Sequence, residues 1–328
     1  MRISALAGDV GAARFLRGLV RQLAARDDAF ANADVTVIGN TAHDITAFGL
    51  RVCPDLDAVM YGLGGRIDDE QGGGRRDDTF AVRDELREYN VPPEWFVLGD
   101  QDFATHIVRT QMLRSGWSLS DVTAALCKRW DPQVTLLPMT DDPVETHVII
   151  DDPDADGGRR AVHFQEWSVR MQSAPGVHEF VFLGADQAKP APGVVESIEL
   201  ADVVLLPPSN PVVGIGAILR VPGVADVLRA TVAPVVGVSP IVADSSDPGI
   251  VDKCLAAIDV ATTAHAIAAH YGSRIAGGLL DGWLVDGADA DANVPGIRQR
   301  SGSLLMPDDA QSVAIAGAAL DLAVDLMS

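Results

Sequence analysis

The stretch Ile3–Phe15, ISALAGDVGAARF, joins an apolar run to a glycine-containing turn and then to a helical pattern. Residues 3–8 have the pattern of a buried strand, and residues 13–25 carry apolar side chains at helical spacing. A second apolar strand, DVTVIGN, is predicted at 34–40. Strand, loop, helix and strand in this order predict a right-handed βαβ unit, which starts a parallel sheet covered by helices.

The rest of the chain continues this α/β pattern. Further strands are predicted at 95–99, 201–210, 234–242 and 279–286. Helices are predicted at 79–90, from residue 100 onward, at 251–270 and at 308–326, and the charged, glycine-rich segment 67–78 is predicted to be a loop. Two strand patterns flank the polar turn DPDADGG, so 145–164 is predicted to be a hairpin in an inserted subdomain.

The composition restricts the partners of this chain. The 46 acidic and 25 basic residues leave a formal charge of −21 over 328 residues. Such a charge repels nucleic acid and anionic membrane surfaces, so we expect small molecules or protein subunits as partners. A polyanionic substrate would need local help from arginine, from helix-terminal amides or from a divalent cation.

Cysteine use and hydropathy indicate a cytoplasmic protein. Cys53, Cys127 and Cys254 are far apart and lack the paired spacing of a zinc site or a disulfide framework. The apolar run at the N-terminus is too short for a signal sequence. No apolar stretch is expected to approach the length of a membrane span.

The first loop matches a dinucleotide-binding fingerprint only in part. Gly8 and Gly11 fit, but Asp9 and Ala12 stand where close phosphate approach favours glycine. The loop either contacts a ligand or is a tight turn in which Asp9 caps the following helix. An oxidoreductase that uses NAD is disfavoured, because Asn40 stands where an acid would bind the ribose.

Polar residues follow the second strand. Asn40, His43 and Asp44 lie at its carboxyl end, where ligands of parallel sheets bind. Asp55 and Asp57 face one way if the chain there is extended, as two oxygen ligands of Mg²⁺ would. The alternative, which we favour on sequence alone, is a proline turn followed by a helix.

Two further segments combine polar groups with a predicted strand end. Asp100 could position a hydroxyl or a metal-bound water, and His106, one turn beyond Asp102, could shuttle a proton. Helix capping is the alternative for this segment. Ser209–Pro211 could bind a polar ring or phosphate, or could form a turn only, and the histidines of the predicted hairpin are expected to be structural.

Several long segments are too irregular to be general features of α/β proteins. They include ARFLRGL, CPDLDAVMYGLGG, VPPEWFVLGDQDFATHIVRTQMLRSG, LLPMTDDPVETHVII and LLPPSNPVVGIGAIL. In these segments, which run nearly from end to end, the chain resembles the 2-phospho-L-lactate transferase family of coenzyme F420 biosynthesis, especially its actinobacterial branch.

The resemblance implies a Rossmann-like core, with a mostly parallel sheet and helices on both faces, plus a smaller inserted α+β subdomain. The two parts of the core would be residues 1–130 and 196–328, and the insertion would be 131–195. It also implies a cytoplasmic homodimer. The reaction would transfer a phospholactyl or phosphoenolpyruvyl group from a guanosine-diphosphate-activated three-carbon acid to the ribityl hydroxyl of the deazaflavin FO, with Mg²⁺ assisting and GMP released.

The resemblance also assigns roles to residues. Asp57 would contact FO, Asp44 and Asp55 would hold the metal, and Asp44, Asp57 and Asp100 would be catalytic. The other residues expected to face a substrate are Gly8, Gly11, Arg14, Asn40, His43, Asp78, Asp102, His106, Ser209, Asn210 and Pro211. A metal held by carboxylates would neutralise the diphosphate in an acidic protein.

The chain departs from the family pattern in its ligand loops. Asp9 replaces a glycine, His43 replaces the first of two successive acids, and Gln101 replaces an arginine. The alternative function is therefore an altered or inactive paralogue that binds a deazaflavin or nucleotide. The enzymatic interpretation requires that Asp44, Asp55, Asp57 and Asp100 gather at neighbouring strand ends.

Overall fold

The computed structural model describes residues 1–67, 74–242, 249–291 and 293–328, so 68–73 of the predicted loop lie outside it. Its centre is one seven-stranded sheet in which every pairing is parallel. In spatial order the strands are β12 (Arg298–Gly302), β11 (Gly282–Asp286), β10 (Val235–Val238), β9 (Val203–Leu206), β1 (Arg2–Ala7), β2 (Asp34–Gly39) and β5 (Thr135–Pro138). The predicted α/β Rossmann-like fold is confirmed.

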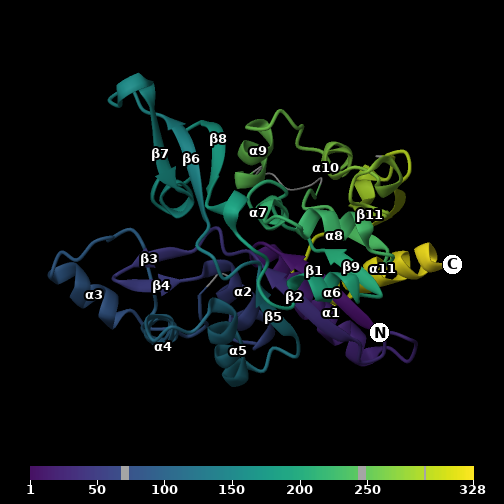
Figure 1. The fold of residues 1–328 in the computed structure, drawn as a ribbon, viewed down its shortest axis with the longest axis horizontal. Helices are drawn as coiled ribbons and strands as arrows, with labels where there is room; N and C mark the ends of the chain where they lie inside the picture. Colours follow the sequence, from purple (N-terminus) through teal and green to yellow (C-terminus); the bar gives the residue numbers. More distant parts are fainter. Residues whose placement is uncertain (68–73, 243–248, 292) are drawn as a thin grey trace.

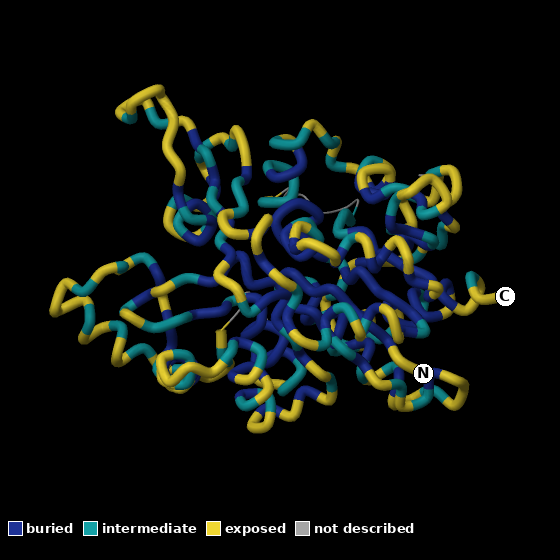
Figure 2. Tube along the Cα trace, in the orientation of Figure 1, coloured by how far each residue is buried: buried dark blue, intermediate teal, exposed yellow. Residues whose placement is uncertain are grey.

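Helices cover both faces of this sheet (Figure 1). On one face pack α1 (Val10–Ala25), α2 (Pro54–Leu63), α5 (Leu119–Trp130) and α11 (Asp309–Met327). On the other pack α6 (Val194–Glu199), α7 (Ile215–Arg220), α8 (Val224–Ala230), α9 (Gly249–Ala256) and α10 (Ala264–Tyr271). Successive strand residues point to opposite faces, so Ala5 and Leu6 of β1 belong to two different cores. Both cores are the dark interior of Figure 2.

The strand order fixes where a ligand can bind. From β1 the chain builds the sheet in one direction through β2 and β5, and then returns to add β9 on the other side of β1. Ligands of such sheets bind beyond the carboxyl ends of the strands at this reversal. The loops that begin at Gly8 and at Pro207 leave those two ends, so they mark the expected site.

Helices α1 and α11 pack closely through two small residues. A methyl group built on Gly18 of α1 would overlap the backbone of Ser312 in α11. A methyl group on Gly317 of α11 would meet only the amide end of the Gln22 side chain, at 3.1 Å. Gly18 therefore permits the close approach, whereas Gly317 does not limit it.

Gly18→Ala is expected to lower the free energy of unfolding by about 1–3 kcal/mol, because the helices must move apart. This loss occurs even though alanine favours helix by about 1 kcal/mol. Gly317→Ala is the matched control and is expected to be neutral or stabilising, since a flexible side chain can move. Urea denaturation of both variants measures the difference, and equal losses would contradict this account of the packing.

Two small lobes extend from the core (Figure 1). One is a three-stranded antiparallel sheet of β6 (Glu145–Asp151), β7 (Arg159–His163) and β8 (Val177–Leu183). It contains the predicted hairpin, to which β8 is added. The other lobe holds the hairpin of β3 (Ile45–Ala47) and β4 (Leu50–Val52), with α3 (Ala81–Glu88) and α4 (Asp100–Arg114). Strand β5 lies in the predicted insertion but pairs with β2 of the main sheet.

Two predicted elements are wrong. Residues 95–99 do not form a strand; instead, Phe96 and Leu98 pack into a small cluster with Phe103. The apolar side chains of this segment therefore fill the small cluster rather than a position in a sheet. The predicted helix 251–270 is divided into α9 and α10. Asp259 adopts a left-handed conformation with φ 56°, and the Thr263 side chain accepts a hydrogen bond from Ala266 N at 3.1 Å, which starts a new helix.

The expectation about apolar stretches is also corrected. Among the described helices, α11 has the length and apolar composition of a membrane span. Its buried residues, including Ile315, Ala319 and Leu320, belong to the core beneath α1. By these contacts α11 serves as a core helix of the α/β fold.

Candidate functional site

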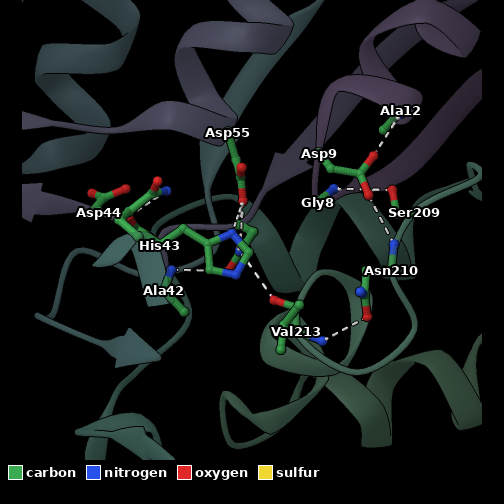
Figure 3. A network of polar contacts seen from close by, with 12 residues as sticks. Gly8, Asp9, Ala12, Ala42, His43, Asp44, Asp55, Ser209, Asn210 and Val213 are labelled. Carbon is green, nitrogen blue, oxygen red and sulfur yellow. Dashed lines mark hydrogen bonds and ion pairs between the residues drawn. The ribbon is translucent and has the colours of Figure 1, made fainter. Parts of the chain in front are cut away.

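The loops after β1 and β9 are joined by the side chain of Asp9 (Figure 3). One carboxylate oxygen accepts a hydrogen bond from Ala12 N at 3.1 Å, and the other accepts one from Asn210 N at 2.9 Å. Ser209 Oγ accepts a hydrogen bond from Gly8 N at 3.3 Å. Asp9 is thus the N-cap of α1, which confirms the capping alternative. Its carboxylate already occupies amides that could bind a phosphate at this helix end.

The ionisation of Asp9 is linked to folding. Burial between the two loops is the main cause that raises the pKa of Asp9 from 3.8 to about 6. A raised pKa means that the folded state binds the proton more tightly than the unfolded chain does. Protonation of Asp9 therefore stabilises the folded state. This contribution to the free energy of unfolding is complete below pH 3.8 and is lost as the pH rises through about 6.

Asp9→Asn removes this titration. Between pH 5 and pH 8, the free energy of unfolding of the wild type is expected to fall by about 1.4 kcal/mol relative to the variant. Urea denaturation of both proteins at several pH values measures the difference. A difference that does not change with pH would show that burial does not perturb Asp9.

The loop after β2 contacts the start of α2 through buried polar side chains. Asn40 Nδ2 donates to Asp55 Oδ2 at 2.7 Å. His43 Nδ1 lies 2.9 Å from the same oxygen of Asp55 (Figure 3). The His43 ring stacks on Phe164, which follows β7, with centroids 4.0 Å apart and planes at 11°. His43 is therefore a polar partner of Asp55, and its ring links the core to the insertion.

Asp44 is the most buried acid of this region. It has no exposed surface, and Oδ2 lies 3.1 Å from an Arg51 guanidinium nitrogen. Apart from this cation and the adjacent Cys53 thiol, the described residues offer no hydrogen-bond donor to its carboxylate. Burial is the main cause that raises the pKa of Asp44 from 3.8 to about 7. This incompletely paired carboxylate is suited to an additional cation.

Asp55 and Asp57 lie in the first turn of α2, after the helix-starting Pro54. The extended arrangement is therefore wrong, and the proline turn followed by a helix is confirmed. Because positions i and i+2 of a helix point about 200° apart, the two carboxylates have different partners. Asp55 faces His43, whereas Asp57 faces Arg109 of α4.

Arg109 binds Asp57 with both terminal nitrogens and is 2% exposed. Burial alone would lower the pKa of Arg109, but the Asp57 carboxylate raises that pKa above its usual value. Nη1 of Arg109 also lies 2.9 Å from His106 Nδ1. Burial lowers the pKa of His106 to about 4. These three side chains form a buried group with one ion pair.

Two other predicted acids, Asp78 and Asp100, accept hydrogen bonds from backbone amides at the starts of helices. Asp100 accepts hydrogen bonds from Thr79 Oγ1, Ala81 N and Val82 N at the start of α3. The Thr79 hydroxyl is the main cause that lowers the pKa of Asp100. Asp78 accepts hydrogen bonds from Gln101 N at 2.9 Å and from Asp102 N at 3.3 Å, at the start of α4. Both carboxylates thus have local structural partners.

A cavity of about 200 Å³ lies between α2 and α4. Its polar lining is Asp55, Asp57, Asp102, His106 and Gln165, and its apolar lining includes Val10, Tyr61, Phe96 and Leu98. A larger hollow of about 710 Å³ lies between α1, α5 and β5. None of the polar residues that follow the carboxyl ends of β1, β2 and β9 line it. We place the candidate site at the smaller cavity because of its chemistry.

The structure thus divides the predicted site residues into groups. The cavity brings together Asp55, Asp57, Asp102 and His106. Around the loops after β1, β2 and β9 lie Gly8, Gly11, Asn40, His43, Asp44, Ser209, Asn210 and Pro211, with Arg14 in the second turn of α1. Asp78 and Asp100 lie at the helix ends described above and do not line the cavity. The predicted gathering of Asp44, Asp55, Asp57 and Asp100 is therefore wrong for Asp100, and only the other three acids are left for the predicted site.

Sequence reasoning did not select Arg51, Arg109, Phe164 and Gln165. Arg109 has one sequence signal, because it follows His106 by one helical turn and therefore shares its face. Phe164 and Gln165 had no comparable signal, since their roles depend on how the insertion folds back onto the loop after β2. Gln165 Nε2 donates to His43 O at 3.4 Å.

Comparison with known proteins identifies the family. The model of the 2-phospho-L-lactate transferase CofD family matches residues 3–320. Phosphoenolpyruvate transferases from Thermobifida fusca and Streptomyces coelicolor are 57% identical over 327 residues and 56% identical over 330 residues, and each alignment covers 99% of both chains. A UPF0052 family protein from Bacillus halodurans is 16% identical with a TM-score of 0.60, over 98% of this chain and 100% of that chain, which shows a common fold. The chain therefore belongs to the 2-phospho-L-lactate transferase CofD family.

Proposed function

We propose that this transferase moves a phosphoenolpyruvyl group from a guanosine-diphosphate-activated donor to the ribityl hydroxyl of the deazaflavin FO in coenzyme F420 biosynthesis, releasing GMP. The names of the relatives at 57% and 56% identity support the phosphoenolpyruvyl donor. The observation that carries the proposal is the cavity lined by Asp55, Asp57 and His106, together with the buried carboxylate of Asp44, which interacts electrostatically with Asp55. Nucleotides commonly bind beyond the carboxyl ends of parallel strands where the strand order reverses. A cavity lined by acids near that position suits an alcohol that must react with a diphosphate.

The residues present fit a Mg²⁺ ion that the substrate helps to hold. No group of three or more His, Cys, Asp or Glu in the described part of the chain could hold a metal alone. Mg²⁺ commonly uses one or two carboxylates together with phosphate oxygens and water. Asp44 and Asp55 would supply those carboxylates, and the bound cation would neutralise charge on the diphosphate.

The chain's own side chains have separate tasks in this proposal. Asp57 accepts a hydrogen bond from FO, and the apolar wall with Tyr61 and Phe96 packs against the ring system. The cavity is smaller than the 300–1,000 Å³ usual for a whole ligand site, so it holds one part of FO. Since Asp9 occupies the amides at the start of α1, the donor phosphates bind beyond this loop.

The test is an assay of the purified protein with FO, Mg²⁺ and either the enolpyruvyl or the lactyl donor. We expect GMP, measured by chromatography, and the FO phosphodiester, measured by mass spectrometry, with the enolpyruvyl donor preferred. Preference for the lactyl donor would overturn the donor assignment.

FO binding without GMP from either donor would favour the alternative, a binding protein that has lost turnover. Asp9 and His43, which fill positions of glycine and acid, are the observations that support this alternative. Sedimentation of the same sample tests the expected homodimer.

A further inference from the structure

Arg109 is a buried cation that touches two cavity-lining residues without lining the cavity itself. Its guanidinium binds both carboxylate oxygens of Asp57, and Nη1 also contacts His106 Nδ1 at 2.9 Å. Asp57 and His106 line the cavity, whereas Arg109 is 2% exposed. Arg109 can therefore act on a bound ligand only through these two side chains.

The contact with Arg109 also determines which nitrogen of His106 carries a proton. A guanidinium donates hydrogen bonds and cannot accept them, so His106 Nδ1 must be the unprotonated acceptor. A neutral imidazole then carries its single proton on Nε2. Burial lowers the pKa of His106 to about 4, which keeps the ring neutral near pH 7. His106 is consequently a hydrogen-bond donor at Nε2.

We propose that Arg109 is a positioning residue for the acceptor alcohol: it fixes Asp57 as a hydrogen-bond acceptor and His106 as a donor on one cavity wall. His106 Nδ1 and Asp57 Oδ2 are 3.7 Å apart, so the imidazole that carries the Nε2 donor is a neighbour of the Asp57 carboxylate, and both side chains line the cavity. A hydroxyl can donate to one and accept from the other, which a carbonyl or an amine cation cannot do. This inference rests on the proposed function, because FO is the alcohol assigned there.

The first test needs no substrate, so its failure is distinct from failure of the proposed function. Wild-type protein labelled with ¹⁵N-histidine is studied by NMR, and the His106 signals are assigned by their loss in His106→Gln. We expect a protonated Nε2 and an unprotonated Nδ1 from pH 6 to pH 8. A proton on Nδ1, or a charged ring in this range, would overturn the inference.

The second test uses Arg109→Lys, with Arg114→Lys as the matched control. Arg114 lies on the same helix and is exposed, with a hydrogen bond to Gly49 O. Lysine keeps the positive charge, but its single ammonium nitrogen cannot bind the two carboxylate oxygens of Asp57 and the Nδ1 atom of His106 at the same time. We expect the KM for FO, or its Kd if turnover is absent, to rise about 10-fold or more in Arg109→Lys only. An unchanged constant for FO, or an equal rise in the KM of the donor, contradicts a positioning role.

The third test separates a donor from a proton acceptor at His106. A glutamine amide can replace the Nε2–H donor but cannot take up a proton near neutral pH. His106→Gln is therefore expected to keep the FO constant within about 3-fold, whereas His106→Ala raises it about 10-fold. Equal losses of kcat in both variants would identify His106 as the proton acceptor and overturn the inference.

Discussion

Arg109→Met is expected to lower the free energy of unfolding by about 3–5 kcal/mol near pH 7. The substitution keeps a long unbranched side chain but removes the cation beside Asp57, which is 5% exposed. An uncompensated charge then remains buried between α2 and α4, and the His106 acceptor loses its donor. Urea denaturation measured by circular dichroism gives the change.

Two further proteins test this explanation. Asp57→Asn combined with Arg109→Met removes both charges, so most of the lost stability should return. Arg114→Met, on the exposed side of the same helix, should stay within about 0.5 kcal/mol of the wild type. If the single Arg109 variant proves as stable as the double variant, the buried charge is not the cause.

Asp44→Asn is expected to reduce kcat about 10²- to 10³-fold while making the folded protein more stable at pH 8. The carboxylate has no exposed surface, and burial raises its pKa from 3.8 to about 7. Ionised Asp44 thus opposes folding above pH 7. With EDTA present to remove bound metal, we expect the free energy of unfolding of Asp44→Asn to exceed that of the wild type by about 1–3 kcal/mol at pH 8. This gain is less than the ~4 kcal/mol that corresponds to the pKa shift of Asp44, because Arg51 loses its partner in the variant.

The gain in stability should shrink at pH 5, where folded wild-type Asp44 is protonated. Asp309→Asn is a control of opposite sign. Partial burial of Asp309 is outweighed by Arg21 and Arg17, so the pKa of Asp309 is lowered. Its asparagine variant should lose stability at pH 8 and keep full activity. An Asp44→Asn protein that is active, or less stable at pH 8, would show that this carboxylate is structural.

The sequence was sufficient for five of the seven strands of the sheet, but not for β5, β12 or the acid cluster. Long apolar runs followed by turns predicted β1, β2, β9, β10 and β11, because buried parallel strands need such runs. Asp100 was expected beside the other acids, since it also follows an apolar segment. Instead it accepts hydrogen bonds from the start of α3. An apolar segment with a polar end looks the same whether or not it joins a sheet.

The local sequence pattern by itself determined the α/β class. It also indicated that Asp9 could cap a helix and that a helix containing Asp55 and Asp57 could begin at Pro54. These features depend only on neighbours in the chain. Only the tertiary structure decided which charges pair. Arg109 meets Asp57 from 52 residues away, and Phe164 of the insertion reaches His43. Such contacts depend on how elements that are distant in the sequence pack together, and the resulting burial, rather than residue type, sets the ionisation of Asp44 and His106.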